Sequence, residues 1–302
     1  MPKATEHDLV STQNAYGLVV LLVLIWGLNW PVMKIGLEDI SPIWLTTIRL
    51  LLGAACLCTL LAVQGRFTLP RRQDYPIVFT IGVMQIAVAL SLISFGLMLV
   101  PAGRAALINN TTPLWAIPLA YLFLKERITF AKLIGLLLGL IGTIILFYPG
   151  EVDWRKQNEL LGNASLIASA IIWAGAIVHL RGHKFTSSPI DLMPWQLLIG
   201  GLLLVPVALL IEGLPAPNFT TSLVGVFLYT GPFVSAFSFW LYINVARTLP
   251  AASTALTGMG EPVAGLGFSA LMLGEAISGA ELSGLALIVL GVGATAASDL
   301  RR

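Results

Sequence analysis

The sequence predicts an all-α polytopic membrane protein whose ten transmembrane helices form two five-helix repeats of inverted orientation. Three observations predict this fold class. The chain is 57% hydrophobic and only 11% charged, whereas soluble globular domains carry about 25% charged residues. Its apolar runs reach the length of roughly 20 residues that a helix needs to cross a bilayer. The second half of the chain also repeats landmarks of the first half.

The first half contains five apolar runs separated by short connections. Helices are expected, because an open strand cannot satisfy its backbone groups in lipid and no polar–apolar alternation indicates a barrel. The polar segment 1–15 is followed by no cleavage site, so we expect a cytoplasmic N-terminal segment and no signal peptide. The first repeat is expected over 16–148. Its five spans are predicted at about 16–35, 42–64, 75–99, 101–124 and 130–148.

The second half contains five further runs and is expected to form the second repeat over 161–298. The last span of each repeat is nearly free of polar residues but rich in glycine at small-xxx-small spacing. Such a stripe allows helices to approach closely, which predicts a packing scaffold or a dimer face. The five spans are predicted at about 161–181, 190–212, 222–246, 250–273 and 280–298.

A shift of 149 residues places 100–142 over 249–291 without a gap, and a shift of 147 aligns the upstream parts of the two halves. In the 149-residue register Pro113 meets Pro262, Glu126 meets Glu275 and Gly135 meets Gly284. Because five is odd, the second copy enters the membrane from the opposite side. Inverted repeats are typical of secondary transporters, which bind their substrate near the midplane between the halves. A symmetric membrane scaffold without transport is the alternative.

The distribution of Lys and Arg predicts the orientation. With both termini in the cytoplasm, twelve of these residues lie on the inner side and four on the outer side, namely Lys34, Arg104, Arg155 and Lys156. Positive charge is enriched in cytoplasmic loops. Arg49 lies within the second span and is interpreted as structural, either snorkelling or pairing with Glu38 or Asp39.

Several function classes lack their sequence signatures. No phosphate-cradling loop is present, so transport is expected to be gradient-driven or facilitative. No Cys/His cluster has metal spacing, and we expect no metal, no cofactor and no catalytic residue. The net charge of +2 gives no argument for nucleic acid. The expected partners are a small-molecule substrate and the lipid bilayer, and the chain is expected to be a monomer or a weak homodimer.

Three stretches resemble the EamA-type proteins of the drug/metabolite transporter superfamily. They are "WGLNWPVMK" at 26–34, the proline–glutamate pair that closes each repeat, and "GEPVAGLGFSALMLGE" at 260–275. The resemblance covers about 16–298. It implies ten helices and export of small metabolites, often amino acids, across the bacterial inner membrane. The chain length and the Trp-rich membrane core are similar to the YddG-like branch of aromatic amino acid exporters.

Polar residues inside predicted spans are candidate site residues, because isolated ones are costly in lipid. Asn109 and Asn110 precede Pro113, where proline loosens the preceding turn. They either line the site or join helices by hydrogen bonds. Thr257 and Glu261 occupy the equivalent place before Pro262. Glu261 has three interpretations: a proton carrier, a binder of a substrate ammonium group, or a structural group that caps loosened backbone.

Aromatic residues provide a second set of candidates. Trp26 and Asn29 are three residues apart and share a helix face. Trp173 is the repeat equivalent of Trp26, and the two rings could sandwich an apolar or aromatic substrate. The alternative is an interfacial aromatic belt. Further candidates for substrate binding are Gln85, Trp240 and Tyr242.

The expected function is a secondary transporter that exports small metabolites, above all amino acids with aromatic or apolar side chains, by alternating access through a central cavity. The alternative substrates are cationic drugs, nucleosides or sugars, and a membrane enzyme or scaffold is a remote alternative. Hinges are expected where helices contain proline, because proline removes a backbone donor. The hinge candidates are Pro31, Pro113, Pro118 and Pro262.

Overall fold

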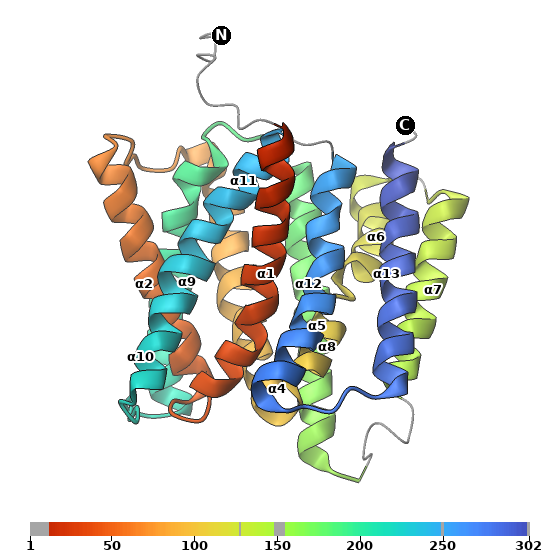
Figure 1. Cartoon of the computed structure of the whole chain (residues 1–302). Coiled ribbons are helices and arrows are strands. Elements are labelled where there is room, and N and C mark those ends of the chain that lie inside the picture. The colour runs from red at the N-terminus through yellow and green to blue at the C-terminus, as the bar shows by residue number, and fades with distance from the viewer. Residues whose placement is uncertain (1–11, 127, 148–154, 249–250, 301–302) are drawn as a thin grey trace.

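The computed structural model of the chain describes residues 12–126, 128–147, 155–248 and 251–300, and every regular element within them is helical. The helices run up and down through one bundle (Figure 1). The first helix, α1 (Thr12–Gly36), begins at the same end of the bundle at which the last helix, α13 (Gly279–Leu300), ends. Residues 1–11, most of the expected N-terminal segment 1–15, lie outside the described residues.

The first half of the chain contains several interrupted helices. After α1 come α2 (Pro42–Val63), the 3₁₀ turn η1 (Arg72–Asp74), α3 (Tyr75–Thr80), the π-helix η2 (Ile81–Ala89), α4 (Leu90–Leu99), α5 (Ala102–Asn109), α6 (Thr112–Leu124) and α7 (Phe130–Leu146). Helices α3, η2 and α4 follow one another without a gap and together form the expected third span. Helices α5 and α6 together form the fourth.

The second half follows the same order. Its elements are α8 (Gln157–Gly182), α9 (Pro189–Ile211), α10 (Thr221–Leu228), the π-helix η3 (Tyr229–Phe237), α11 (Ser238–Thr248), α12 (Ala251–Leu273) and α13. Every apolar run predicted from the sequence therefore coincides with a helix or with consecutive helices. The eighth run, like the third, contains a nine-residue π-helix at the corresponding position. Neither π-helix was predicted from the sequence.

The protein is an all-helical, multi-pass membrane protein. Six helical stretches among the described residues are long and apolar enough to cross a membrane: Gly17–Gly36, Pro42–Val63, Arg72–Leu99, Gln157–Gly182, Pro189–Ile211 and Thr221–Tyr242. The stretches Lys132–Leu146 and Gly279–Ala294 are apolar but shorter. Length and apolarity thus support six spans directly, and the total of ten stays a prediction.

Helices α2 and α9 pack against each other in opposite directions. Beyond the end of α2, Arg66 forms a 2.8 Å ion pair with Asp191 at the start of α9. At the start of α2, Glu212 from the end of α9 accepts hydrogen bonds from the Ser41 hydroxyl at 2.6 Å and from the Trp44 amide at 3.1 Å. The connections that follow α2 and α9 consequently lie at opposite ends of the bundle, as Figure 1 also shows.

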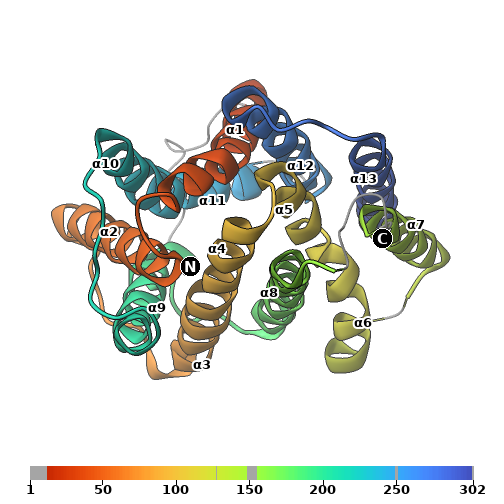
Figure 2. The same ribbon diagram turned by 90° about the horizontal axis from the view of Figure 1, so that it is seen from below.

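Helices α7 and α13 pack together at one edge of the bundle, and α1 packs on α12 (Figure 2). The backbones of α7 and α13 come into contact through glycine. A Cβ atom on Gly291 would lie 2.5 Å from the Gly135 carbonyl oxygen, and one on Gly142 would lie 2.8 Å from that of Gly284. The glycine stripes of the fifth and tenth predicted spans therefore face each other inside one chain, as the packing interpretation expects.

The junction between α4 and α5 is held from two sides. The Lys34 ammonium donates hydrogen bonds to the carbonyl oxygens of Leu97 at 2.6 Å and Val100 at 2.9 Å, where α4 ends. The Glu275 carboxylate accepts from the amides of Ala102 at 2.7 Å and Gly103 at 2.9 Å, where α5 begins. A cation at a helix C-terminus and an anion at a helix N-terminus both complement the helix dipole.

Candidate functional site

The α5–α12 contact brings two of the predicted site residues together. Glu261 lies in the middle of α12, half-buried, and its Oε1 atom accepts a hydrogen bond from the Trp30 indole nitrogen of α1 at 3.2 Å. The Asn110 side chain also lies close to this carboxylate, while its Nδ2 atom donates to the Ala106 carbonyl oxygen at 2.9 Å. Three helices thus meet at Glu261, which satisfies part of the hydrogen-bonding capacity that a carboxylate retains inside a membrane protein.

The break between α5 and α6 directs two consecutive asparagines to different neighbours. Asn110 faces Glu261, whereas the Asn109 Oδ1 atom lies 3.5 Å from the Ser169 hydroxyl of α8. The break falls immediately before Pro113, which occupies the first turn of α6. Proline fits a first turn, because its missing N–H would have no partner there. The loosened turn predicted at this point is therefore present as a complete interruption.

The other hinge candidates lie within helices that continue past them. Pro31 lies inside α1, Pro118 inside α6 and Pro262 inside α12. The equivalent prolines of the two halves therefore differ: Pro113 follows a break in the helix, whereas the helix continues through Pro262. Their role as hinges stays a prediction.

Trp26 and Tyr242 form an aromatic cluster between α1 and α11. Their ring centroids are 5.6 Å apart, and Phe239 is a third member at 6.4 Å from Trp26. The Trp26 indole nitrogen donates to the Ser238 hydroxyl at 2.9 Å. Trp240 lies on another face of α11, stacks on Phe237 at 5.9 Å and is 41% exposed. Among the described residues, the structure shows no ring contact between Trp240 and Trp26.

The remaining predicted residues are distributed over the bundle. Trp173 packs against the large core cluster of α1, α5 and α8, whereas Trp26 packs against a separate one. The structure shows no ring contact between Trp26 and Trp173 in the described chain, so the aromatic sandwich stays a prediction. Gln85 is half-buried in η2. Thr257 belongs to α12, and its side chain lies outside the described part.

The interpretation of Arg49 as a snorkelling residue or a partner of Glu38 or Asp39 was wrong. Arg49 is only 4% exposed, and its Nη1 atom donates to the Met33 sulfur of α1 at 2.9 Å. Asp39 is occupied elsewhere, because it accepts a 2.5 Å hydrogen bond from the Thr220 hydroxyl. The acids close to Arg49 in sequence thus belong to the connection beyond α1, while Arg49 points into the bundle.

A second buried arginine was also missed. Arg104 was counted among outer-side charges, but it is 6% exposed in α5, and its Nε atom donates to the side-chain Oδ1 atom of Asn163 in α8 at 3.2 Å. It also donates to the Leu146 carbonyl oxygen. Its place near the outer end of the fourth predicted span, 101–124, put it among the outer-side charges.

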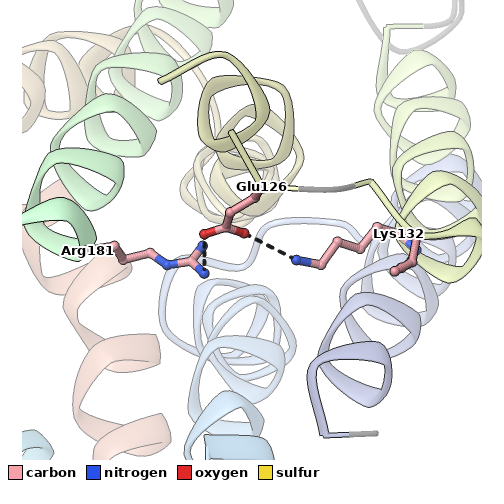
Figure 3. A network of polar contacts seen from close by, with 4 residues as sticks. Glu126, Lys132 and Arg181 are labelled. Atoms are coloured by element: carbon pink, nitrogen blue, oxygen red, sulfur yellow. Dashed lines mark hydrogen bonds and ion pairs between the residues drawn. The ribbon is translucent and has the colours of Figure 1, made fainter. Parts of the chain in front are cut away.

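The glutamates that close the two halves differ in their partners. Glu126 follows α6 and lies between Arg181 of α8 at 2.8 Å and Lys132 of α7 at 3.5 Å (Figure 3). Glu275 instead caps the start of α5. Both join the connection between two helices to a third element, which confirms that they organise these connections.

The arrangement is that of a helical, multi-pass membrane protein. The EamA-like transporter family matches the chain twice, over residues 13–148 and 160–296. The chain belongs to this family, which confirms the resemblance inferred from the sequence. The family and the relatives are named as transporters, in agreement with the expectation that the chain is not an enzyme.

Two relatives carry names that mention amino acids. The chain is 28% identical over 286 residues to a "Probable amino-acid metabolite efflux pump" of Salmonella typhimurium, covering 91% of this chain and 92% of the relative. It is 27% identical over 287 residues to a "Probable terminal-alkyne amino-acid exporter" of Streptantibioticus cattleyicolor, covering 92% of each. A solved structure titled "Crystal structure of protein" matches 96% of this chain and 99% of its own chain with a TM-score of 0.66 and 22% identity. That last match supports the fold alone.

Proposed function

We propose that the chain is a ten-span secondary transporter, built from five-helix repeats 16–148 and 161–298 in inverted orientation, that exports amino acids by alternating access through a central cavity. The observation that carries the proposal is the exchange of equivalent contacts between the halves. Asp39, after α1, accepts from Thr220 before α10; Thr186, its equivalent in the second half, donates to Asp74 before α3 at 2.6 Å. A two-fold relation between the halves is the architecture of many secondary transporters.

The proposed topology places both termini in the cytoplasm and the chain in the bacterial inner membrane as a monomer or weak homodimer. The Lys and Arg bias supports the orientation. The beginning of α1 and the end of α13 lie at one end of the bundle (Figure 1), in keeping with an even number of spans. The glycine-rich faces of α7 and α13, which could otherwise pair two copies of the chain, contact each other within one chain. This contact favours the monomer.

An amino acid, aromatic or apolar, is the substrate class that the relatives' names and the local chemistry favour together. Trp26 and Tyr242 offer an aromatic surface between α1 and α11. Asn110 and Glu261 offer polar groups beside α1, where α12 packs on it. Export of cationic drugs, nucleosides or sugars is the second candidate. Only the cationic drug has a specific observation in its favour, because Glu261 is an acid in the middle of a helix.

The proposal is tested by overproducing the protein in cells and challenging them with toxic analogues. Resistance to aromatic amino acid analogues, with faster efflux of labelled L-phenylalanine, is expected. Resistance confined to cationic dyes would replace amino acids with drugs as the substrate. Chemical conversion of an analogue by the purified protein would favour an enzyme.

The role of Glu261 is tested by Glu261→Gln, which keeps the shape and one acceptor oxygen for Trp30. If Glu261 carries protons or binds the substrate ammonium, the variant loses transport or its dependence on pH. If both are unchanged, Glu261 is structural. Measuring thermal unfolding in parallel separates a loss of transport from a loss of folded protein.

A further inference from the structure

The structure contains a buried cation without a negatively charged partner. Arg49 reaches from α2 to α1, and its guanidinium is hydrogen-bonded only to the Met33 sulfur among the described residues, while its Nε atom is buried without an acceptor. A thioether is a weak acceptor. A buried charge that lacks a partner is strongly unfavourable, and such groups inside membranes are functional by default.

Asn29 shares this position and has the opposite deficiency. Its Nδ2 atom donates to the same Met33 sulfur at 3.2 Å, and its Oδ1 atom is buried with no donor. The Arg49 and Asn29 side chains therefore converge on one sulfur atom from two helices. Together they leave a cation without an acceptor and a carbonyl oxygen without a donor.

These two deficiencies match the two ends of an α-amino acid. A guanidinium binds a carboxylate through two parallel hydrogen bonds, and an amide oxygen accepts from an ammonium group. A phosphate would be expected to draw further cations, but the nearby Lys34 is already bound to carbonyl oxygens at the end of α4. One arginine therefore suits a monocarboxylate better than a phosphate.

We propose that Arg49 and Asn29 form the binding site for the α-carboxylate and α-amino groups of the substrate, with the Met33 sulfur occupying this place until the substrate arrives. Methionine suits that role, because its unbranched side chain turns aside easily. Trp26 lies one helical turn from Asn29, so the substrate side chain would extend toward the Trp26–Tyr242 cluster. This inference rests on the proposed function and names the groups that recognise its substrate.

The test compares Arg49→Met, Arg49→Lys and Met33→Leu with the control Arg66→Met, which removes an arginine exposed at one end of the bundle. The purified proteins are titrated with L-phenylalanine, L-leucine, 3-phenylpropanoate, which lacks the ammonium group, and 2-phenylethylamine, which lacks the carboxylate. Binding is read from tryptophan fluorescence and from the shift in the thermal unfolding midpoint. Uptake of labelled L-phenylalanine is measured in proteoliposomes.

Arg49→Met is expected to weaken binding of both amino acids and of 3-phenylpropanoate by at least about tenfold, the equivalent of one charged hydrogen bond. Its unliganded unfolding midpoint is expected to equal or exceed that of the wild type, because an unpaired buried charge has gone. Arg49→Lys is expected to recover part of the carboxylate binding. Met33→Leu is expected to bind carboxylates at least as well as the wild type, since the competing sulfur is absent.

Three results would overturn the inference: wild-type carboxylate affinity in Arg49→Met, no binding of any carboxylate to the wild type, or an equal loss of 2-phenylethylamine binding together with a lower unfolding midpoint. The proposed function fails separately. If binding depends on Arg49 but wild-type proteoliposomes show no uptake, the proposed binding site is upheld and the proposed transport function is refuted. If uptake is unchanged in Arg49→Met, the transport function is upheld and the binding site is refuted.

Discussion

Replacing Glu275 with glutamine tests whether the hydrogen bonds of its carboxylate to the α5 N-terminus stabilise the bundle. The carboxylate accepts from the Ala102 amide at 2.7 Å and the Gly103 amide at 2.9 Å. Glutamine keeps one acceptor oxygen and turns an N–H toward the other amide, so one bond to a charged group is lost at about 1.5–3 kcal/mol. Losing the anion at the helix start adds about 0.3–1 kcal/mol. The free energy of unfolding should therefore fall by about 2–4 kcal/mol.

The measurement is reversible unfolding in mixed micelles with increasing dodecyl sulfate, followed by circular dichroism. Asp191→Asn is the matched control. It removes an acid from a 2.8 Å ion pair with Arg66, whose side chain is 48% exposed. Exposed pairs contribute about 0.2–1 kcal/mol. If Glu275→Gln unfolds at the same dodecyl sulfate concentration as Asp191→Asn, the assigned strength of the helix cap is wrong.

Two other substitutions probe the packing and the buried polar contacts. Gly291→Ala places a Cβ atom 2.5 Å from the Gly135 carbonyl oxygen, and overpacking of this kind lowers the free energy of unfolding by about 1–3 kcal/mol. The control is Gly175→Ala, which has nothing within 4 Å of its Cβ position and should be neutral or stabilising in the same unfolding assay. Equal effects of the two substitutions would refute the close contact. Asp74→Asn should lower the free energy of unfolding by at least about 2 kcal/mol. Asp74 is fully buried, and its carboxylate accepts hydrogen bonds from the His183 ring at 3.0 Å and from Thr186. An unfolding curve that matches the wild type would contradict this prediction.

The sequence predicted the helices well, because apolar composition alone marks a segment that crosses lipid. It also located the interruption before Pro113, since the effect of proline on the preceding turn is local. It did not predict η2 and η3, because nothing in "IGVMQIAVA" distinguishes a π-helix from an α-helix. The π-helices depend on how those segments pack against neighbours far away in sequence.

The candidate site was predicted unevenly, for a related reason. Asn110 and Glu261 were both named as candidates because each comes shortly before a proline at equivalent places of the repeat, but their proximity was not predicted. The partner of Arg49 was misjudged because acids close in sequence were available, whereas Asp39 is bound to Thr220 in the structure. Which way a charged side chain turns inside a bundle depends on neighbouring helices, and the sequence of its own helix does not show that.

The reciprocal contacts between the halves also limit how alike the two halves can be. In both contacts the aspartate belongs to the first half and the threonine to the second: Asp39 pairs with Thr220, and Asp74 pairs with Thr186. A molecule assembled from two copies of the first half would set Asp39 against Asp74, and two adjacent carboxylates repel each other. Two copies of the second half would leave only hydroxyl groups facing one another. The two halves are therefore complementary at these contacts, and a change that makes one half more like the other at these positions removes a contact.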